Sequence, residues 1–201
     1  MEQNKKVLIG RLTVGEYQTN CYIVRAEGCR QCCVIDPGYE PELILQQAEK
    51  AGLEIEAVLL THGHFDHVGG VKILAAETGC RVYIHPDDLS LPPMLTAGPI
   101  YHTDTYTDGD SITAGGLSFR VLSTPGHTRG SVCLITGDVM FSGDTLFQGS
   151  CGRTDLPGGS YTDISASLAR LAALEDDYRV YPGHMGPTTL AYEKQSNPYM
   201  Q

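Results

Sequence analysis

Short apolar runs separated by glycines and polar turns fill the first part of the chain. The runs at residues 7–14, 21–25 and 32–35 are rich in valine, isoleucine and cysteine, which predicts short strands. Residues 41–52 predict a helix instead, because the segment begins with a proline, spaces its apolar residues at the helical interval and ends at a glycine.

The middle of the chain predicts a strand, a polar loop, a helix and a second strand. Residues 57–60 are consecutive apolar residues, a pattern typical of a strand buried on both faces. Residues 69–78 predict a helix and residues 81–84 the next strand. Because open α/β sheets hold their sites at the carboxyl ends of strands, the polar loop after residue 60 is a candidate site.

The second half of the chain returns to strands, predicted at residues 117–122, 132–135, 139–142 and 179–181. Helices are predicted at residues 161–174 and 188–195. This order favours an α/β fold with two mixed sheets and helices on their outer faces. Residues 86–110 contain a Pro-Pro and a Gly-Pro pair without regular periodicity, and we expect them to form a mobile flap over the site.

Composition and charge restrict the class of protein. The chain has 201 residues, 41% of them hydrophobic, and no linker or low-complexity segment, which predicts one domain over 1–201. A net charge of −10 argues against a nucleic-acid binder or a polybasic membrane anchor, and no apolar run is long enough for a membrane span. Seven cysteines, an odd number, indicate reduced thiols and a cytoplasmic location.

One stretch after the predicted strand at 57–60 is dense in potential metal ligands. His62 and His64 are two positions apart, so at an extended strand end they point the same way. Asp66 and His67 follow where the chain turns into the next helix. Imidazole and carboxylate suit zinc, manganese and iron, and the cluster therefore predicts a metal site.

Three further candidates lie at later turns. They are His127 in a Thr-Pro-Gly-His-Thr segment, Asp144 after a Ser-Gly pair, and His184 in a Tyr-Pro-Gly-His segment. Each is weak alone, but together they place most of the histidines at predicted strand ends. His85 and His102 have no comparable partners, and we expect them to be loop or surface residues.

These residues, together with Asp36 in an early Asp-Pro-Gly turn, resemble the pattern of the metallo-β-lactamase superfamily. The resemblance implies an αββα sandwich with a two-metal site between the sheets. It also implies a ligand set: one metal held by His62, His64 and His127, the other by Asp66, His67 and His184, with Asp144 as the bridge and Asp36 supporting the ligands.

Within that superfamily, residues 143–147 and the Gly-Arg-Thr-Asp segment at 152–155 are similar to short bacterial members of the glyoxalase II branch. This implies a hydrolase that cleaves a small thioester, such as an S-2-hydroxyacylglutathione, with a hydroxide that bridges two divalent ions. Asp66 and His67 would be catalytic, and the ions would be zinc, with iron or manganese as alternatives. Full-length glyoxalase II has a C-terminal helical extension that grips glutathione; this chain is expected to lack it, which leaves the thiol carrier open.

Two alternatives remain beside the thioesterase. Persulfide dioxygenases, which use a single iron, also resemble the chain and share both the 152–155 segment and a cysteine at position 151. Hydrolysis of a lactone or another ester is a variant of the first hypothesis. The Gly-Pro-Thr turn at 186–188 and the Asn-Pro pair at 197–198 favour the hydrolase.

Two arginines are the candidates for contact with a small anionic thioester or ester substrate, the expected partner. Arg153 follows the predicted bridge residue, although an exposed salt bridge with Asp155 explains it equally well. Arg129 lies two positions after His127. Cys151 is interpreted as a partly buried bystander. The remaining close group of thiols has no evident fourth ligand for zinc, so we expect it to be structural; it comprises Cys29, Cys32 and Cys33.

Overall fold

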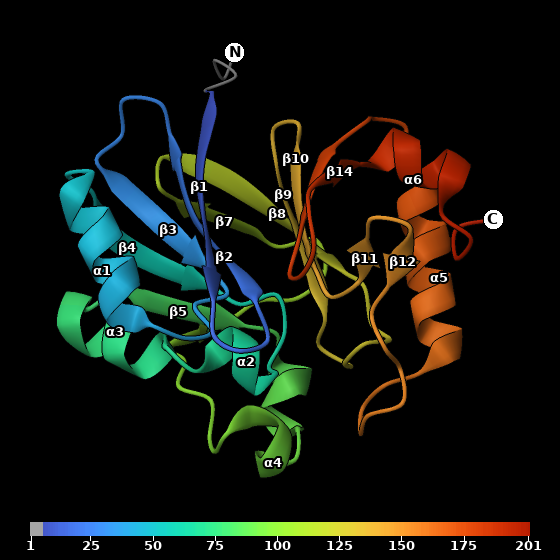
Figure 1. Cartoon of the computed structure of the whole chain (residues 1–201), viewed down its shortest axis with the longest axis horizontal. Coiled ribbons are helices and arrows are strands. Elements are labelled where there is room, and N and C mark those ends of the chain that lie inside the picture. Colours follow the sequence, from blue (N-terminus) through green and yellow to red (C-terminus); the bar gives the residue numbers. More distant parts are fainter. Residues whose placement is uncertain (1–5) are drawn as a thin grey trace.

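The computed structural model describes residues 6–201 as two six-stranded sheets packed face to face, with helices on both outer sides (Figure 1). The predicted domain also includes residues 1–5, which lie outside the described residues. The predicted α/β class and the sandwich of two mixed sheets are confirmed.

The first sheet has the order β1-β2-β3-β4-β5-β6. Its strands are antiparallel from β1 to β3 and parallel from β3 to β6. Their bounds are β1 (Val7–Val14), β2 (Thr19–Ala26), β3 (Gln31–Ile35), β4 (Glu54–Leu59), β5 (Arg81–Ile84) and β6 (Asp104–Thr105).

The second sheet has the order β14-β13-β10-β9-β8-β7, with a parallel pairing only between β10 and β13. A two-stranded sheet, β11-β12, stands beside it. The bounds are β7 (Ser111–Ala114), β8 (Leu117–Ser123), β9 (Val132–Thr136), β10 (Val139–Gly143), β11 (Leu146–Phe147), β12 (Ser150–Cys151), β13 (Arg179–Pro182) and β14 (Thr188–Thr189).

The helices cover the outer faces and the lower rim of the sandwich (Figure 1). They are α1 (Pro41–Lys50), α2 (Phe65–Val68), α3 (Val71–Thr78), a 3-10 helix η1 (Pro86–Ser90), α4 (Pro93–Thr96), α5 (Tyr161–Ala172) and α6 (Leu190–Ser196). No helix in the described part of the chain is long and apolar enough to cross a membrane.

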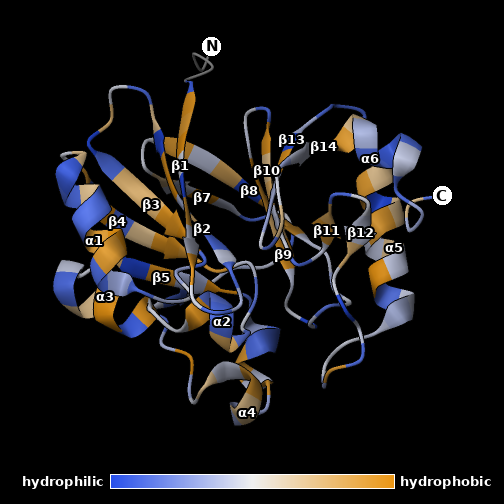
Figure 2. Ribbon diagram, viewed as in Figure 1, coloured by the Kyte–Doolittle hydropathy of each residue, from blue (hydrophilic) through white to orange (hydrophobic). Residues whose placement is uncertain are grey.

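Three apolar layers hold these elements together. In β3, Cys32 and Val34 pack toward the helices of the first side, while Cys33 and Ile35 pack into the layer between the sheets. This explains the unbroken apolar runs, since alternate side chains enter different cores and neither face meets water. Figure 2 shows how strands and helices differ in hydropathy: many strand residues are hydrophobic, whereas α1, α3 and α5 combine hydrophobic and hydrophilic residues.

Some predicted boundaries were wrong. The strand predicted at 21–25 begins at Thr19, and its first residues prove to support the site. The helix predicted at 69–78 is α3, which begins at Val71, and a short helix that was not predicted, α2, precedes it across a glycine pair. The segment 86–110, predicted to be irregular, contains η1, α4 and β6. The strands β7, β11, β12 and β14 were not predicted.

Candidate metal centre

Loops and the short helix α2 at one edge of the sandwich carry all seven predicted ligands. His62 and His64 follow the end of β4, and Asp66 and His67 lie in α2. His127 lies between β8 and β9, Asp144 directly follows β10, and His184 lies two residues after the end of β13. Strand ends from both sheets therefore converge here, as the sequence predicted for a site at the carboxyl ends of strands (Figure 1).

The first group of ligand candidates, called trio 1 below, consists of His62, His64 and His127. All are buried, and their ring nitrogens lie close enough together to hold one ion. Nδ1 of His64 is 2.9 Å from Nε2 of His127. His127 donates its Nδ1 proton to the backbone carbonyl of Arg153, at 2.8 Å. That bond fixes the tautomer and leaves the lone pair of Nε2 available to bind a metal.

The second group, trio 2, consists of Asp66, His67 and His184. Nε2 of His67 lies 3.4 Å from Nε2 of His184. Oδ2 of Asp66 is 3.5 Å from the former nitrogen and 3.3 Å from the latter. The hydroxyl of Thr19 donates to this same Oδ2 at 2.9 Å and so orients the carboxylate.

Asp144 lies between the two trios. Its Oδ2 is 3.5 Å from Nε2 of His127, in trio 1, and 3.5 Å from Nε2 of His184, in trio 2. Its Oδ1 is 3.5 Å from Nε2 of His67. A carboxylate in this position has the geometry to contact ions in both trios.

Asp36 lies close enough to His62 and His67 to form a third possible ligand group, but hydrogen bonds already engage its carboxylate. It is buried and has a left-handed backbone, with φ of 51°, which is uncommon outside glycine. Its carboxylate accepts the backbone N–H of Thr61 at 2.8 Å, the Thr61 hydroxyl at 2.6 Å and Nδ1 of His67 at 3.0 Å. With both oxygens engaged, Asp36 orients the His67 ring and holds its proton on Nδ1.

Unpartnered polar atoms in this cluster fit a bound cation. Nε2 of His62, Nε2 of His64 and Oδ1 of Asp144 are buried and have no hydrogen-bond partner. In the described part of the chain only one other buried side-chain atom, the Ser123 hydroxyl, shares this condition. Because buried polar atoms are rarely left unsatisfied, this concentration of nitrogen and oxygen donors suits a divalent metal.

His62 and His64 of trio 1 are held in the form that binds metal. Burial lowers the pKa of His62 well below its usual value, and the neighbouring histidines add to the effect. Burial, followed by the charge of His127, lowers the pKa of His64 to about 4. Both imidazoles are therefore neutral at physiological pH, with lone pairs available for coordination.

Trio 2 has the opposite electrostatics. Burial disfavours the charged form of His67, but the carboxylates of Asp144 and Asp36 outweigh it and raise its pKa to about 9. Burial likewise opposes ionisation of Asp66, yet the hydrogen bond from His184, the charge of His67 and the hydrogen bond from Thr19 together hold its pKa below the ordinary range. The carboxylates at this side attract positive charge, whether it is a proton or a metal ion.

Sequence reasoning missed the residues that tether the loop of His184. Asn20 donates from its side chain to the carbonyls of Pro182 and Met185, both at 2.9 Å. The Tyr22 hydroxyl donates to the carbonyl of Pro182 at 2.6 Å. Tyr22 reads as an ordinary member of the predicted strand and Asn20 as a polar residue just before it, so no sequence signal distinguished them.

The remaining candidates lie at different distances from the cluster. The guanidinium of Arg153 is exposed and makes a two-bond pair with Asp155, the alternative that the sequence had left open. Arg129 is exposed on the loop after His127. His85 and His102 belong to neither trio, and His102 is exposed.

The cysteines stay outside the site. Cys151 is half-buried in β12 and packs against the core beneath α5 and α6. Cys32 and Cys33 are buried on opposite faces of β3, and no metal-binding group found among the described residues includes a cysteine.

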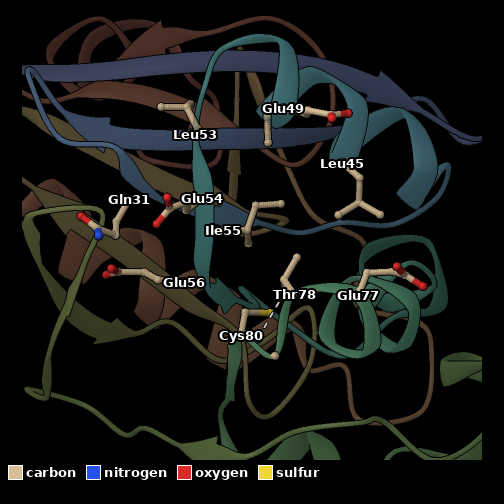
Figure 3. Close-up of a pocket in the computed structure, with 12 residues that line it drawn as sticks. Gln31, Leu45, Glu49, Leu53, Glu54, Ile55, Glu56, Glu77, Thr78 and Cys80 are labelled. Carbon is tan, nitrogen blue, oxygen red and sulfur yellow. Dashed lines mark hydrogen bonds between the residues drawn. The ribbon is translucent and has the colours of Figure 1, made fainter.

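A groove of about 950 Å³ lies at the other end of the first sheet (Figure 3). It opens where β4 begins, whereas the metal centre follows the end of that strand. Four glutamates line it, namely Glu49, Glu54, Glu56 and Glu77, together with Cys80 and apolar side chains. None of the ligand candidates reaches this groove.

Comparison with known proteins agrees with this geometry. The metallo-beta-lactamase superfamily profile matches residues 14–184. A hydroxyacylglutathione hydrolase, GloC, from Haemophilus influenzae is 34% identical over 204 residues, covering 94% of this chain and 96% of its own length.

Solved structures are equally similar. BLEG-1, described as a B3 metallo-beta-lactamase, superposes with a TM-score of 0.87 at 34% identity, over 96% of this chain and 99% of its own. TTHA1623, solved in a di-iron-bound form, superposes with a TM-score of 0.82 at 38% identity, over 94% of this chain and 99% of its own. ETHE1 from Myxococcus xanthus superposes with a TM-score of 0.81 at 31% identity, over 95% of this chain and 83% of its own. With its layered fold, its His/Asp cluster and these relatives, the chain belongs to the metallo-beta-lactamase superfamily.

Proposed function

We propose that the chain is a two-metal hydrolase that cleaves a small thioester resembling an S-2-hydroxyacylglutathione. The position of Asp144 carries this proposal, because its Oδ2 lies 3.5 Å from Nε2 of a histidine in each trio. A single ion would need one trio only, whereas a carboxylate shared between two trios suits a pair of ions.

Each ligand group has its own part. His62, His64 and His127 would hold one divalent ion, Asp66, His67 and His184 would hold the other, and Asp144 would contact both. When bound, two divalent ions lower the pKa of a shared water and polarise the substrate carbonyl. Zinc suits the imidazole and carboxylate donors, and so do iron and manganese.

The chain's own residues would direct the hydrolysis. The oxygen of water adds to the acyl carbon, the C–S bond breaks, and the thiolate takes up the proton that the water released. Asp66 is the proposed proton-handling residue, since its carboxylate is buried beside the point where the trios meet, whereas His67 acts as a ligand because Asp36 holds its proton on Nδ1. Asp36 keeps the His67 ring in place, and Thr19 keeps the Asp66 carboxylate in place.

The choice of a thioester rests on the relatives. The H. influenzae protein named hydroxyacylglutathione hydrolase GloC matches this chain along nearly the whole length of both proteins. The thiol carried by the substrate is therefore proposed to be glutathione or a similar small anionic thiol. The free cysteines of the described residues support a reducing compartment, and we propose the cytoplasm.

The test is hydrolysis of S-lactoylglutathione by purified protein whose metal content has been measured, with and without a chelator. Turnover that disappears with the chelator and returns with zinc would support the thioesterase. A protein that binds two ions but leaves the thioester intact would contradict this substrate and redirect the search to other thioesters, esters and lactones.

A second candidate is favoured by the similarity to ETHE1 of M. xanthus. This candidate is the oxidation of a persulfide at a single iron. The resemblance of the sequence to persulfide dioxygenases is compatible with it. It predicts one iron per chain and oxygen consumption with a glutathione persulfide. Metal counting and an oxygen electrode therefore separate it from the hydrolase.

A further inference from the structure

One carboxylate in the segment after β5 is buried against the metal centre but belongs to neither trio. Asp88 lies in η1 and has an exposed fraction of 0%. Its Oδ2 accepts the backbone N–H of Gly63 at 2.7 Å and the hydroxyl of Thr128 at 2.8 Å. Its Oδ1 accepts the backbone N–H of Gly130 at 2.7 Å.

The three donors lie on the two loops that carry trio 1. Gly63 stands between His62 and His64, and Thr128 directly follows His127. The carboxylate therefore joins a loop of the first sheet to a loop of the second. The two loops are about 65 residues apart in sequence, and the bonds of Asp88 fix their separation.

Two glycines allow this close approach. A Cβ at position 130 would come within 2.7 Å of the Asp88 carboxyl group, and one at position 63 within 3.2 Å of the Asp88 Cβ. The backbones of both loops thus pack directly against Asp88, with no room for a side chain at either glycine. A small displacement of this residue would move both loops.

The hydrogen bonds that hold trio 2 come from residues of β2 and from Asp36, and not from Asp88. Thr19 in β2 binds Asp66, while Asn20 and Tyr22 bind the loop before His184. The hydrogen bonds of Asp88 reach none of these residues. The hydrogen bonds of Asp88 can consequently be removed without removing any of these bonds to trio 2.

We propose that Asp88 is a positioning residue that fixes the His62–His64 loop against the His127 loop and thereby sets the metal affinity of trio 1. This inference rests on the proposed function, since it takes trio 1 to be a metal site. It adds that the hydrogen bonds of Asp88 serve the loops of trio 1 only, whereas Asp36 reaches both sites through Thr61 and His67, so loss of Asp88 should weaken one site while the other keeps its affinity.

The carboxylate is matched to its partners. All three groups that face the Asp88 carboxylate donate hydrogen bonds to it, and a carboxylate accepts hydrogen bonds at both oxygens. The amide in Asp88→Asn has nearly the same shape but must turn its NH₂ toward at least one of these donors. Asp88→Asn thus removes at least one of the three hydrogen bonds that join the loops, without leaving a cavity, and Asp88→Ala removes all three.

The experiment is a titration of metal-stripped protein with zinc against a chromophoric chelator, which resolves two binding steps. His64→Ala and His184→Ala identify which step belongs to which trio. We expect Asp88→Asn and Asp88→Ala to weaken the trio 1 step by about 10- to 100-fold, the usual effect of losing a residue that supports ligands, and to leave the trio 2 step unchanged.

Asp87→Asn is the matched control, since its side chain is adjacent, in the same helix and 59% exposed. It should bind zinc like the wild type. Circular dichroism checks the fold of every variant, and Asp88→Asn decides the outcome if Asp88→Ala does not fold.

Wild-type affinity in both steps of Asp88→Asn would overturn the inference. Equal weakening of both steps, or failure of both variants to fold, would also overturn it, because either result makes Asp88 a general structural residue. If the wild-type protein bound no zinc, the proposed function itself would fall, and that result does not depend on any Asp88 variant.

Discussion

Nδ1 of His127 donates a hydrogen bond to the backbone carbonyl of Arg153 at 2.8 Å. The residue that the sequence singled out for its charge therefore contacts the site through its backbone. Its guanidinium turns away to Asp155, with bonds of 2.7 and 2.8 Å. A carbonyl survives any substitution of the side chain, so the two roles of Arg153 can be tested separately.

Arg153→Ala should leave zinc affinity and kcat unchanged but raise the KM for an anionic thioester by about two- to fivefold, the scale of an exposed charge interaction. The reason is that the carbonyl to His127 remains, while a cation near the site is lost. Steady-state kinetics with S-lactoylglutathione at low ionic strength provide the measurement.

Asp155→Asn is the companion variant, because it releases the guanidinium from its exposed partner. If Arg153 contacts substrate, this change should lower KM or leave it unchanged. An unchanged KM in both variants would remove Arg153 from the substrate site and leave its backbone role alone.

His64→Ala should abolish metal binding at trio 1 and reduce turnover by about two orders of magnitude or more, given the several kcal/mol that metal ions contribute to such reactions. The fold should persist, since the side chain faces the ligand cluster and not one of the apolar layers. Metal analysis, circular dichroism and kinetics check the three statements. Wild-type turnover in this variant would refute the assignment of trio 1.

Gly183→Ala should disrupt the site although it removes no ligand. A Cβ at this position would lie 2.2 Å from Oδ1 of Asp144 and 2.7 Å from the ring of His67, so the metal centre must shift. Overpacking of this kind costs about 1–3 kcal/mol, and we expect at least a tenfold loss of zinc affinity.

Gly186→Ala in the same loop is the control for this change. A Cβ there would meet only the side-chain oxygen of Gln148, at 4.0 Å, so its zinc affinity should match the wild type. If the two alanine variants behave alike, the close packing at Gly183 has no bearing on the metals.

The sequence predicted the ligand cluster because the ligands share a simple signal. Each of His62, Asp144 and His184 follows an apolar strand, and strand ends from both sheets meet at one edge of the sandwich. The layered fold was predictable for a related reason, since continuous apolar runs require strands with both faces covered. These signals are local in sequence, and the rest of the fold follows from how the strands pair.

The supports of the site had no such signal. Asp88 lies in a His-Pro-Asp-Asp segment that reads as an exposed helix start, and nothing local indicates that its carboxylate is buried between two loops. Asn20 likewise reads as a polar residue near a turn. Both act on partners far away in sequence, at 25 to 165 residues, so only the pairing of the two sheets reveals their role.

Cys151 should react slowly with iodoacetamide at neutral pH. Burial raises the pKa of this thiol above its usual value, and only the thiolate is a nucleophile. Below that raised pKa the thiolate fraction is smaller than in an unfolded peptide containing the same cysteine, and it grows about tenfold per pH unit. The alkylation rate, followed by mass spectrometry of the digested protein, should therefore keep rising at pH values where the peptide has reached its plateau. Guanidinium chloride should abolish the difference, and Cys151→Ser should retain wild-type thioester turnover. A rate at pH 7 equal to or above that of the peptide would show an activated thiol and favour a catalytic role for Cys151.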